Sequence, residues 1–294
     1  MHVQISTPYR HVIAEALAWE SPLGGSPIRH ANTGVNMNIE LRSQIPALTI
    51  GKVALAFIGS LAVTGCAGNS SSKVQAPGEP ATALTKTLDV GADALQSRPP
   101  VAALNAYLDG FHFYNGSMKA QMEAHHYCSI LNEEVIQCVI YDGNVKDAKL
   151  MGVEYIISER LFATLPTAEQ ALWHSHVHEV KSGQLIAPGI PAPAEHALMQ
   201  KLVNTYGKTW HTWHTDQDKK LPLGMPQLMM GFTADGQANP SMVRQRDERF
   251  DVDSSAEKKS RQDIPTPVVH PGADAWSRGK VIQIDDPTGV KHGH

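Results

Sequence analysis

The sequence predicts an α+β protein: a single mixed domain with an antiparallel or mixed sheet and packed helices, flanked by disordered tails. Helical and strand-like patterns both occur between residues 101 and 250, without the regular alternation of a parallel α/β fold. The flanking segments are rich in Gly, Ser, Pro or charged residues, which favours disorder. The 294 residues, 42% of them hydrophobic, are enough for a sizeable core.

The overall charge excludes a strongly electrostatic partner. The chain has 25 basic and 29 acidic residues, for a formal net charge of -4. This balance provides no general attraction for nucleic acid, so we expect no nucleic-acid partner. The sequence does not identify a protein partner.

The N-terminal part has the layout of a targeting segment. Residues 1–36 show no convincing periodicity, and we expect them to be a non-native or removed extension. From Met37 onward, Arg42 and Lys52 form a basic region before the apolar residues 53–63. This is the arrangement of a secretory signal peptide, assigned here to residues 37–65. Its apolar region is too short to span a bilayer, which needs about 20 residues.

The end of this segment resembles a bacterial lipobox, Val63-Thr64-Gly65-Cys66. The resemblance implies cleavage before Cys66 and attachment of lipid, such as palmitate, to that cysteine. A generic signal peptide and a buried apolar strand are the alternatives. We therefore expect a lipoprotein that is bound to the membrane through the lipid on Cys66. Because Ala67 follows the cysteine, the expected location is the bacterial cell envelope, at the outer membrane and facing the periplasm.

Residues 66–100 are predicted to be a flexible tether, because Gly, Ser, Ala, Thr and Pro dominate them. A short helix over residues 82–96 is compatible with this segment. The folded domain is expected over residues 101–250, followed by a mobile tail over residues 251–294, where the chain is charged and Pro-rich.

Several elements of the domain follow from periodicity and turn signals. Roughly helical apolar spacing predicts a helix over residues 117–131, and β-branched runs predict strands over 135–141 and 150–158. Thr167 and Gln170 have the spacing of a capping box, which indicates a short helix up to Trp173. A helix over 194–206 should end at Gly207, and strands are expected over 209–215 and 227–233.

A histidine-rich stretch is the strongest candidate for a functional site. His174, His176 and His178 are two residues apart, so they share one face only if the backbone is an extended strand. We therefore predict a strand with an imidazole-lined stripe. In a helix, only His174 and His178 would be neighbours.

These histidines could hold zinc or another divalent metal with further donors elsewhere in the chain. Imidazole and carboxylate donors suit first-row metals, and an open coordination position would permit hydrolysis. The alternative is a polar network without metal, because the helical His-Glu-X-X-His motif of many zinc enzymes is absent. The sequence establishes no cofactor. The candidate ligands are His174, His176, His178, His125, His126 and Glu123, with Glu179 also available.

Cys128 and Cys138 are candidates for a disulfide, because disulfides persist in exported proteins. If one cysteine is helical and the other lies in a strand, the geometry would oppose the bond. Both alternatives stay open. The sequence has no Gly-X-Ser-X-Gly nucleophile motif and no phosphate-binding loop.

Six segments of the central half of the chain form a recognisable set: Phe111-His112-Phe113-Tyr114-Asn115-Gly116, Glu123-Ala124-His125-His126-Tyr127-Cys128, Gly152-Val153-Glu154-Tyr155-Ile156-Ile157-Ser158, Leu172-Trp173-His174-Ser175-His176, Glu179-Val180-Lys181-Ser182-Gly183 and Leu221-Pro222-Leu223-Gly224. In these segments the chain resembles the oil-body-associated protein family, a family with a domain of unknown function. The resemblance implies association with lipid and brings no established catalytic residue. We therefore expect an exported, lipid-anchored bacterial lipoprotein with no established catalytic activity. A metal-dependent hydrolase using His174, His176 and His178 is the alternative.

The sequence departs from the plant pattern at two histidines. His211 and His214 usually have non-histidine counterparts in the plant proteins that the chain resembles. A site that needs either of them is therefore not implied by the resemblance.

Overall fold

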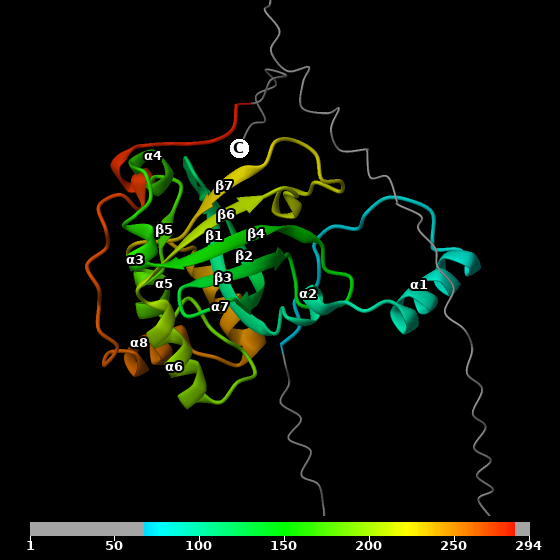
Figure 1. Ribbon diagram of the computed structural model, residues 1–294, viewed down its shortest axis with the longest axis horizontal. Helices are drawn as coiled ribbons and strands as arrows, with labels where there is room; N and C mark the ends of the chain where they lie inside the picture. The colour runs from blue at the N-terminus through cyan, green and yellow to red at the C-terminus, as the bar shows by residue number, and fades with distance from the viewer. Residues whose placement is uncertain (1–67, 286–294) are drawn as a thin grey trace, which may run out of the picture. The chain divides into compact units, whose positions relative to one another are not determined.

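The strands pair into one antiparallel sheet that closes on itself (Figure 1). The computed structural model describes residues 68–285. The strand order is β4-β3-β2-β1-β7-β6-β5, and an additional pairing between β4 and β6 closes a ring of six strands, with β5 pairing onto β6. The strands are β1 (Ala106–Tyr114), β2 (Ser117–Ile130), β3 (Val135–Tyr141), β4 (Leu150–Ser158), β5 (His174–Ser175), β6 (Thr205–His211) and β7 (Gln227–Met230).

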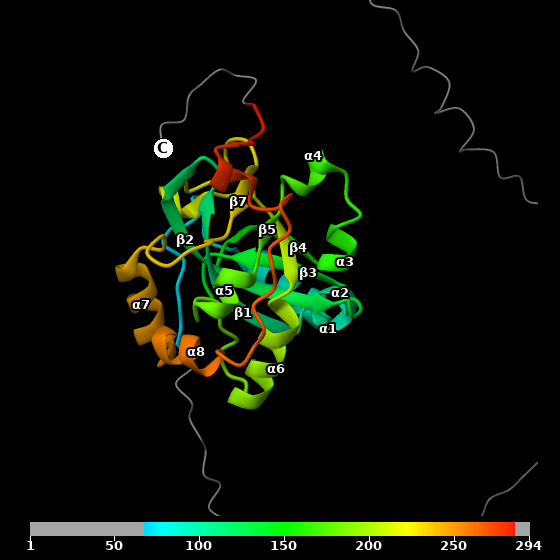
Figure 2. The same cartoon turned by 90° about the vertical axis from the view of Figure 1, so that its left-hand side faces the viewer.

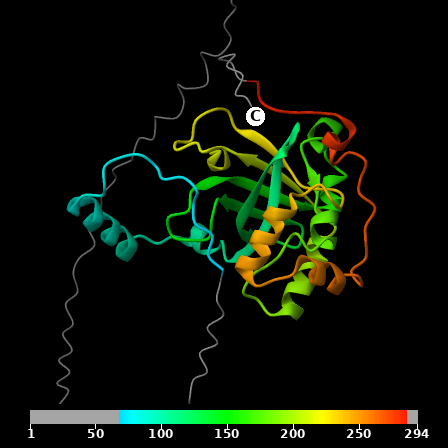
Figure 3. The same ribbon diagram turned by 180° about the vertical axis from the view of Figure 1, so that it is seen from behind.

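Short helices surround this closed sheet. Helices α5, α6 and α8 gather at one end of it, as two perpendicular views show (Figures 1 and 2). Helix α7 packs against β2, which is seen from behind in Figure 3. None of the helices between residues 68 and 285 has the length and apolar character needed to cross a bilayer. The helices are α1 (Ala83–Leu95), α2 (Pro99–Ala102), α3 (Glu159–Phe162), α4 (Thr167–Gln170), α5 (Val177–Lys181), α6 (Ala192–Leu202), α7 (Pro240–Phe250) and α8 (Ser254–Ser260), with 3-10 turns η1 (Thr215–Gln217) and η2 (Ala275–Arg278).

Alternate residues of each strand face the interior of the ring. The pairing puts Leu108 opposite His126, Cys128 opposite Cys138, and Cys138 opposite Glu154, so these side chains share the inward face. The interior is apolar at both ends and polar in the middle. One apolar end contains Tyr114, Met122, Ala124, Ile140, Met151 and Met229, and the other contains Leu108, Cys128, Ile136, Cys138, Ile156 and Val180.

The predicted helix over residues 117–131 is wrong, because this segment is the long strand β2. Met122, Ala124 and Cys128 are inward-facing positions at strand spacing, and β2 is paired along both edges, with β1 and β3. These two ladders outweigh the local helical spacing of the apolar residues.

The other predicted elements agree with the structure to different degrees. The strands predicted over 135–141 and 150–158 are β3 and β4 with the same bounds. The predicted strand over 209–215 is shifted to β6, and the one over 227–233 is shortened to β7. The helix predicted over 194–206 is α6, which begins and ends earlier. The capping box is not formed: Pro166 is the N-cap of α4 and makes no side-chain cap hydrogen bond.

The chain beyond Phe250 is not a tail throughout. Arg261 is fully buried, and its guanidinium donates to the carbonyl oxygens of Val180 at 2.8 Å and Leu185 at 2.9 Å. Asp274 accepts hydrogen bonds from the backbone N–H and hydroxyl of Ser175 at 3.0 and 2.6 Å. Charged residues that composition assigns to solvent are therefore buried with partners here. The domain extends at least to Gln283, whose side chain accepts from the Leu228 N–H and donates to the carbonyl oxygens of Asn115 and Leu228.

The beginning of the predicted tether is also fixed to the domain. Asn144 donates through Nδ2 to the Gly68 carbonyl at 2.7 Å and accepts from the Ser70 N–H at 2.6 Å, while Ser72 donates to Asp142 at 2.6 Å. Farther along, α1 matches the short helix expected there, and its Leu84, Leu88 and Leu95 are exposed. The proposed extension, the signal peptide and Cys66 lie outside the described residues.

Cys128 and Cys138 are joined by a disulfide. Both cysteines lie in strands, directly opposite each other on β2 and β3. The geometric obstacle considered for a helix and a strand therefore does not arise.

Candidate metal centre

The histidine stretch is not a single strand, so the predicted three-histidine stripe is wrong. Strand β5 has two residues, His174 and Ser175, and pairs with Gly207 and Tyr206 of β6. The backbone leaves the extended conformation at His176, which has φ -87° and ψ 0° and is the N-cap of α5. His178 is consequently a helical residue.

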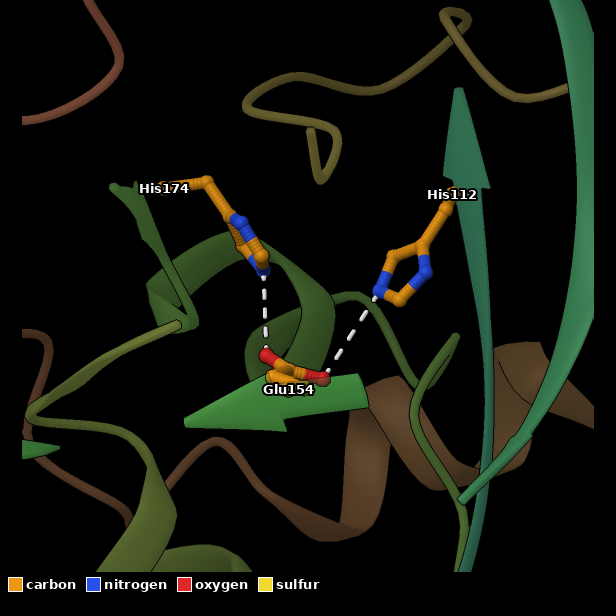
Figure 4. Close-up of side chains that lie close together, drawn as sticks. All are labelled: His112, Glu154 and His174. Carbon is orange, nitrogen blue, oxygen red and sulfur yellow. Dashed lines mark ion pairs between the residues drawn. The ribbon is translucent and has the colours of Figure 1, made fainter. Parts of the chain in front are cut away.

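His174 and His176 nevertheless approach the same carboxylate, Glu154 on β4. The Nε2 atoms of His176 and His174 lie 3.2 and 3.5 Å from Glu154 Oε1. The other oxygen, Oε2, lies 2.9 Å from His126 Nε2 and 3.9 Å from His112 Nε2. Figure 4 shows His174 and His112 directed at Glu154 from opposite sides.

Two further donors complete a buried group in the middle of the closed sheet. Glu179 Oε1 lies 3.7 Å from His174 Nε2, and the ring of His211 is centred 5.6 Å from that of His112. All these side chains belong to residues that are at most 5% exposed. The group, named the His–Glu cluster below, consists of His112, His126, Glu154, His174, His176, Glu179 and His211.

Many polar atoms of the His–Glu cluster have no hydrogen-bond partner among the described residues. Both ring nitrogens of His126, His174 and His211 are in this state, as is Glu179 Oε1. The short approach of His126 to Glu154 lacks the alignment of a hydrogen bond. An unsatisfied buried polar group costs about 1–3 kcal/mol, so such a concentration points to a missing bound species, an ion or water.

The spacing of the donor atoms fits coordination. Two donors that are each about 2.1 Å from one ion lie roughly 3.0–3.4 Å apart, depending on whether the geometry is octahedral or tetrahedral. The distances from Glu154 to the imidazoles of His126, His174 and His176, 2.9 to 3.5 Å, fall in or beside this range.

The electrostatic environment favours the metal-binding protonation state at His112, His211 and Glu154. Burial, and then repulsion from His126, lowers the pKa of His112 well below its usual value, and burial lowers the pKa of His211 to about 3. Burial alone would raise the pKa of Glu154, but the imidazoles of His126, His174 and His176 hold it well below its usual value. Neutral imidazoles and an ionised carboxylate are the ligand forms of these three groups. Two other groups are shifted the other way. Burial lowers the pKa of His126, but the neighbouring Glu154 raises it above its usual value, and burial raises the pKa of Glu179 to about 7.

Two glycines, Gly207 and Gly231, provide the space that side chains of the His–Glu cluster fill. A Cβ atom at Gly207 would overlap Glu154 Oε1 and lie 2.7 Å from His176 Nε2. A Cβ atom at Gly231 would overlap Glu179 Oε1. At these two positions the backbone approaches the ligand atoms so closely that only glycine fits without displacement.

The remaining predicted ligands lie elsewhere. His125 and Glu123 belong to a second group, named the outer cluster below, which faces α7 from the outside of the sheet. There, His125 Nδ1 lies 2.9 Å from Asp109, while Arg246 pairs with Asp109 at 3.1 Å and Arg249 pairs with Glu123. His125 and Glu123 are on the face of β2 opposite to His126, so they are not ligands of the His–Glu cluster. With Asp109 they form a separate group whose donor atoms lie within 4.8 Å of one another, and its carboxylates are already paired with arginines.

His178 is also separate from the His–Glu cluster. It is half-buried, and burial lowers the pKa of its imidazole. The charged groups that act on it are Asp235 and Lys258.

Sequence reasoning missed His112, Glu154 and His211 as ligands. Glu154 has a detectable signal, because it is a lone charged residue at an alternate position of the apolar strand β4, on the same face as Gly152 and Ile156. His112 has a similar signal between Phe111 and Phe113. Both occur in segments that carry the family resemblance. His211 lies outside those segments.

The His–Glu cluster is suited to hold a divalent first-row metal inside the sheet. Imidazole nitrogen and carboxylate oxygen suit zinc, iron, manganese and related ions. A hydrolytic centre would need an open position reached by substrate. The low exposure of every donor residue therefore fits an enclosed metal better than a hydrolytic site.

Comparisons with known proteins identify relatives of this chain. Residues 98–265 match the family described as "Protein of unknown function (DUF1264)". The chain is 42% identical over 218 residues to oil body-associated protein 1B of Arabidopsis thaliana, covering 74% of this chain and 90% of the relative. It is 40% identical over 230 residues to oil body-associated protein 1A of Zea mays, covering 76% and 97%. No solved structure matches. The family match spans all seven strands and the His–Glu cluster. With these plant relatives, it shows that the chain belongs to the oil-body-associated family of DUF1264 proteins.

Proposed function

We propose that this chain is a metal-binding member of the oil-body-associated family, with a divalent first-row metal held by the His–Glu cluster. The observation that carries the proposal is the convergence of buried, unpartnered imidazole nitrogens on Glu154. No arginine or lysine in the described residues forms an ion pair with Glu154 or Glu179, so a metal would supply the missing positive charge. The enclosed position favours a non-hydrolytic role.

The test is the metal content of the chain as isolated from the producing cells without chelator. Inductively coupled plasma mass spectrometry should find a first-row metal at one or more equivalents per chain. Glu154→Ala should lose most of it, because this carboxylate contacts four of the imidazoles. The matched control is Glu123→Ala, since Glu123 is a glutamate of the neighbouring outer cluster. A metal-free wild type, or equal metal in the two variants, would contradict the proposal.

A second candidate function concerns location and lipid. We propose that the chain is a lipoprotein anchored through Cys66 at the outer membrane, and that its domain associates with lipid, as the oil-body association in the names of its plant relatives suggests. The anchor would have a structural consequence, because Gly68, two residues after Cys66, is hydrogen-bonded to the domain through Asn144. Two residues span at most about 7 Å, so lipid on Cys66 would hold the domain directly at the bilayer surface.

Cell fractionation tests the lipid anchor. The wild type should be in the membrane fraction and Cys66→Ser should be released and remain unprocessed. Ser71→Ala, in the same segment and exposed, is the control that should behave as the wild type does. The anchor is refuted if Cys66→Ser remains as firmly membrane-bound as the wild type.

A further inference from the structure

The two oxygens of Glu154 face different pairs of histidines. Oε1 is approached by His174 and His176 at 3.5 and 3.2 Å, and Oε2 by His126 and His112 at 2.9 and 3.9 Å. A carboxylate that binds one ion through one oxygen would gather its neighbours on that side. Here imidazoles approach both carboxylate oxygens of Glu154.

The number of donors also exceeds the need of one ion. Zinc takes four ligands in most protein sites, and other first-row ions rarely take more than six. The His–Glu cluster offers five imidazoles and two carboxylates, and Glu179 stands on the same side as His174, whose Nε2 is 3.7 Å from it. His211 stands beside His112 on the other side.

We propose that the His–Glu cluster holds two metal ions bridged by the Glu154 carboxylate, an inference that rests on the metal-binding function proposed above. One ion is bound by His174, His176, Glu179 and Oε1 of Glu154. The other is bound by His112, His126 and Oε2, with His211 as the additional donor. Paired metal ions in proteins lie about 3.5–4 Å apart, a separation that a bridging carboxylate spans.

The fold separates the two half-sites along the chain. His112 and His126 come from β1 and β2, which are paired with each other. His174 comes from β5, and His176 and Glu179 come from the N-cap and first turn of α5. Glu154 on β4 lies between them as the shared ligand. Each half-site can therefore be altered without changing a ligand of the other.

The unpartnered atoms are present in both half-sites. His126 and His211 have free ring nitrogens on one side, and His174 and Glu179 have free donor atoms on the other, as judged within residues 68–285. One ion placed between Glu154, His174 and His112, whose donor atoms lie within 4.8 Å of one another, would leave Glu179 and His211 unsatisfied. Two ions satisfy both.

Metal titration of the full chain tests the inference. After metal removal and dialysis, one sample of the wild type is titrated with Co²⁺ alone, and binding is followed by visible absorption. Two further samples are loaded with Co²⁺ or with Zn²⁺, and the bound metal in each is quantified by mass spectrometry. We expect saturation at two equivalents per chain. Saturation at one equivalent overturns the paired site but preserves the proposed metal-binding function. No bound metal in either assay overturns both.

Half-site variants identify the two positions. His126→Ala should retain one equivalent bound by the α5 side, and His176→Ala should retain one equivalent bound by the β1–β2 side. Glu154→Gln should lose the bridge and bind less than one equivalent. The control is His196→Ala, because His196 is partly exposed and pairs with Asp263 outside the cluster. This variant should retain two equivalents of metal. Circular dichroism checks folding, and the wild-type stoichiometry decides the inference if a variant does not fold.

Discussion

The His–Glu cluster and the outer cluster contain the same kinds of residue but are neutralised differently. His125 and His126 are adjacent on β2, and one faces each cluster. In the outer cluster, Arg246 and Arg249 compensate the carboxylates of Asp109 and Glu123. In the His–Glu cluster, Glu154 and Glu179 have only imidazoles around them. Histidines and carboxylates together do not define a metal site; the absence of a resident cation is the distinguishing feature.

The largest effect should come from removing the resident cation of the outer cluster. Arg246→Ala leaves Asp109 buried without its guanidinium partner, and both side chains are fully buried. We expect the free energy of unfolding to fall by about 3–5 kcal/mol, measured by urea denaturation. The control Arg244→Ala breaks an exposed pair with Glu248 and should change it by less than about 0.5 kcal/mol. Equal effects would show that the outer cluster is not held by its arginines.

Removing metal from the His–Glu cluster should have the next largest effect. A ligand present at 100 times its Kd stabilises the folded state by ~2.7 kcal/mol. A chelator should therefore lower the thermal midpoint of the wild type, and added Zn²⁺ or Mn²⁺ should restore it. Glu154→Gln should be insensitive to the chelator, whereas Glu123→Gln should respond as the wild type does. A wild type whose midpoint ignores chelator would contradict a metal in this cluster.

A methyl group at Gly207 should compete directly with the ligands. In Gly207→Ala the new Cβ overlaps Glu154 Oε1, so the carboxylate must move away. We expect a loss of about 1–3 kcal/mol in stability and a loss of bound metal, measured by calorimetry and mass spectrometry. Gly91→Ala is the control, because nothing lies within 4 Å of its new Cβ and the residue is helical. That variant should keep its metal and gain up to about 1 kcal/mol.

The smallest effect should come from a histidine outside both clusters. His178→Ala should leave the metal content unchanged and alter stability by about 0.5 kcal/mol or less, since the side chain is half-buried and lacks a ligand partner. The measurement is the same metal analysis, with His174→Ala as the contrasting variant. Metal loss in His178→Ala would restore the three-histidine stripe that the sequence suggested.

The sequence predicted the strands that have strong β-branched patterns and missed those set by pairing. β3 and β4 are recognisable because most of their residues are apolar or β-branched, and the turn signal Asp142-Gly143 follows β3. β2 was not, because its apolar residues also fit a helix and only the ladders with β1 and β3 decide between the two. Ring closure between β4 and β6 joins segments about fifty residues apart, and no local pattern encodes it.

The site was predictable in part for the same reason. The sequence shows the chemistry of His174, His176 and His126. The predicted stripe of His174, His176 and His178 is interrupted, because the backbone turns at His176 and α5 begins at Val177. Glu154 and His112 join the cluster only through the pairing of distant strands. His125 was a plausible ligand until its facing direction was known, since adjacent residues on a strand point to opposite sides.

The disulfide between β2 and β3 also fixes the pairing register of these strands, and with it the position of His126. Cys128 and Cys138 are tied where they stand opposite each other, and His126 is two positions along the same inward face. Sliding β2 by one residue would exchange the roles of His125 and His126, turning the inner ligand outward and burying its neighbour against Glu154. The disulfide prevents that shift in register. It therefore keeps His126, and not His125, on the inward face.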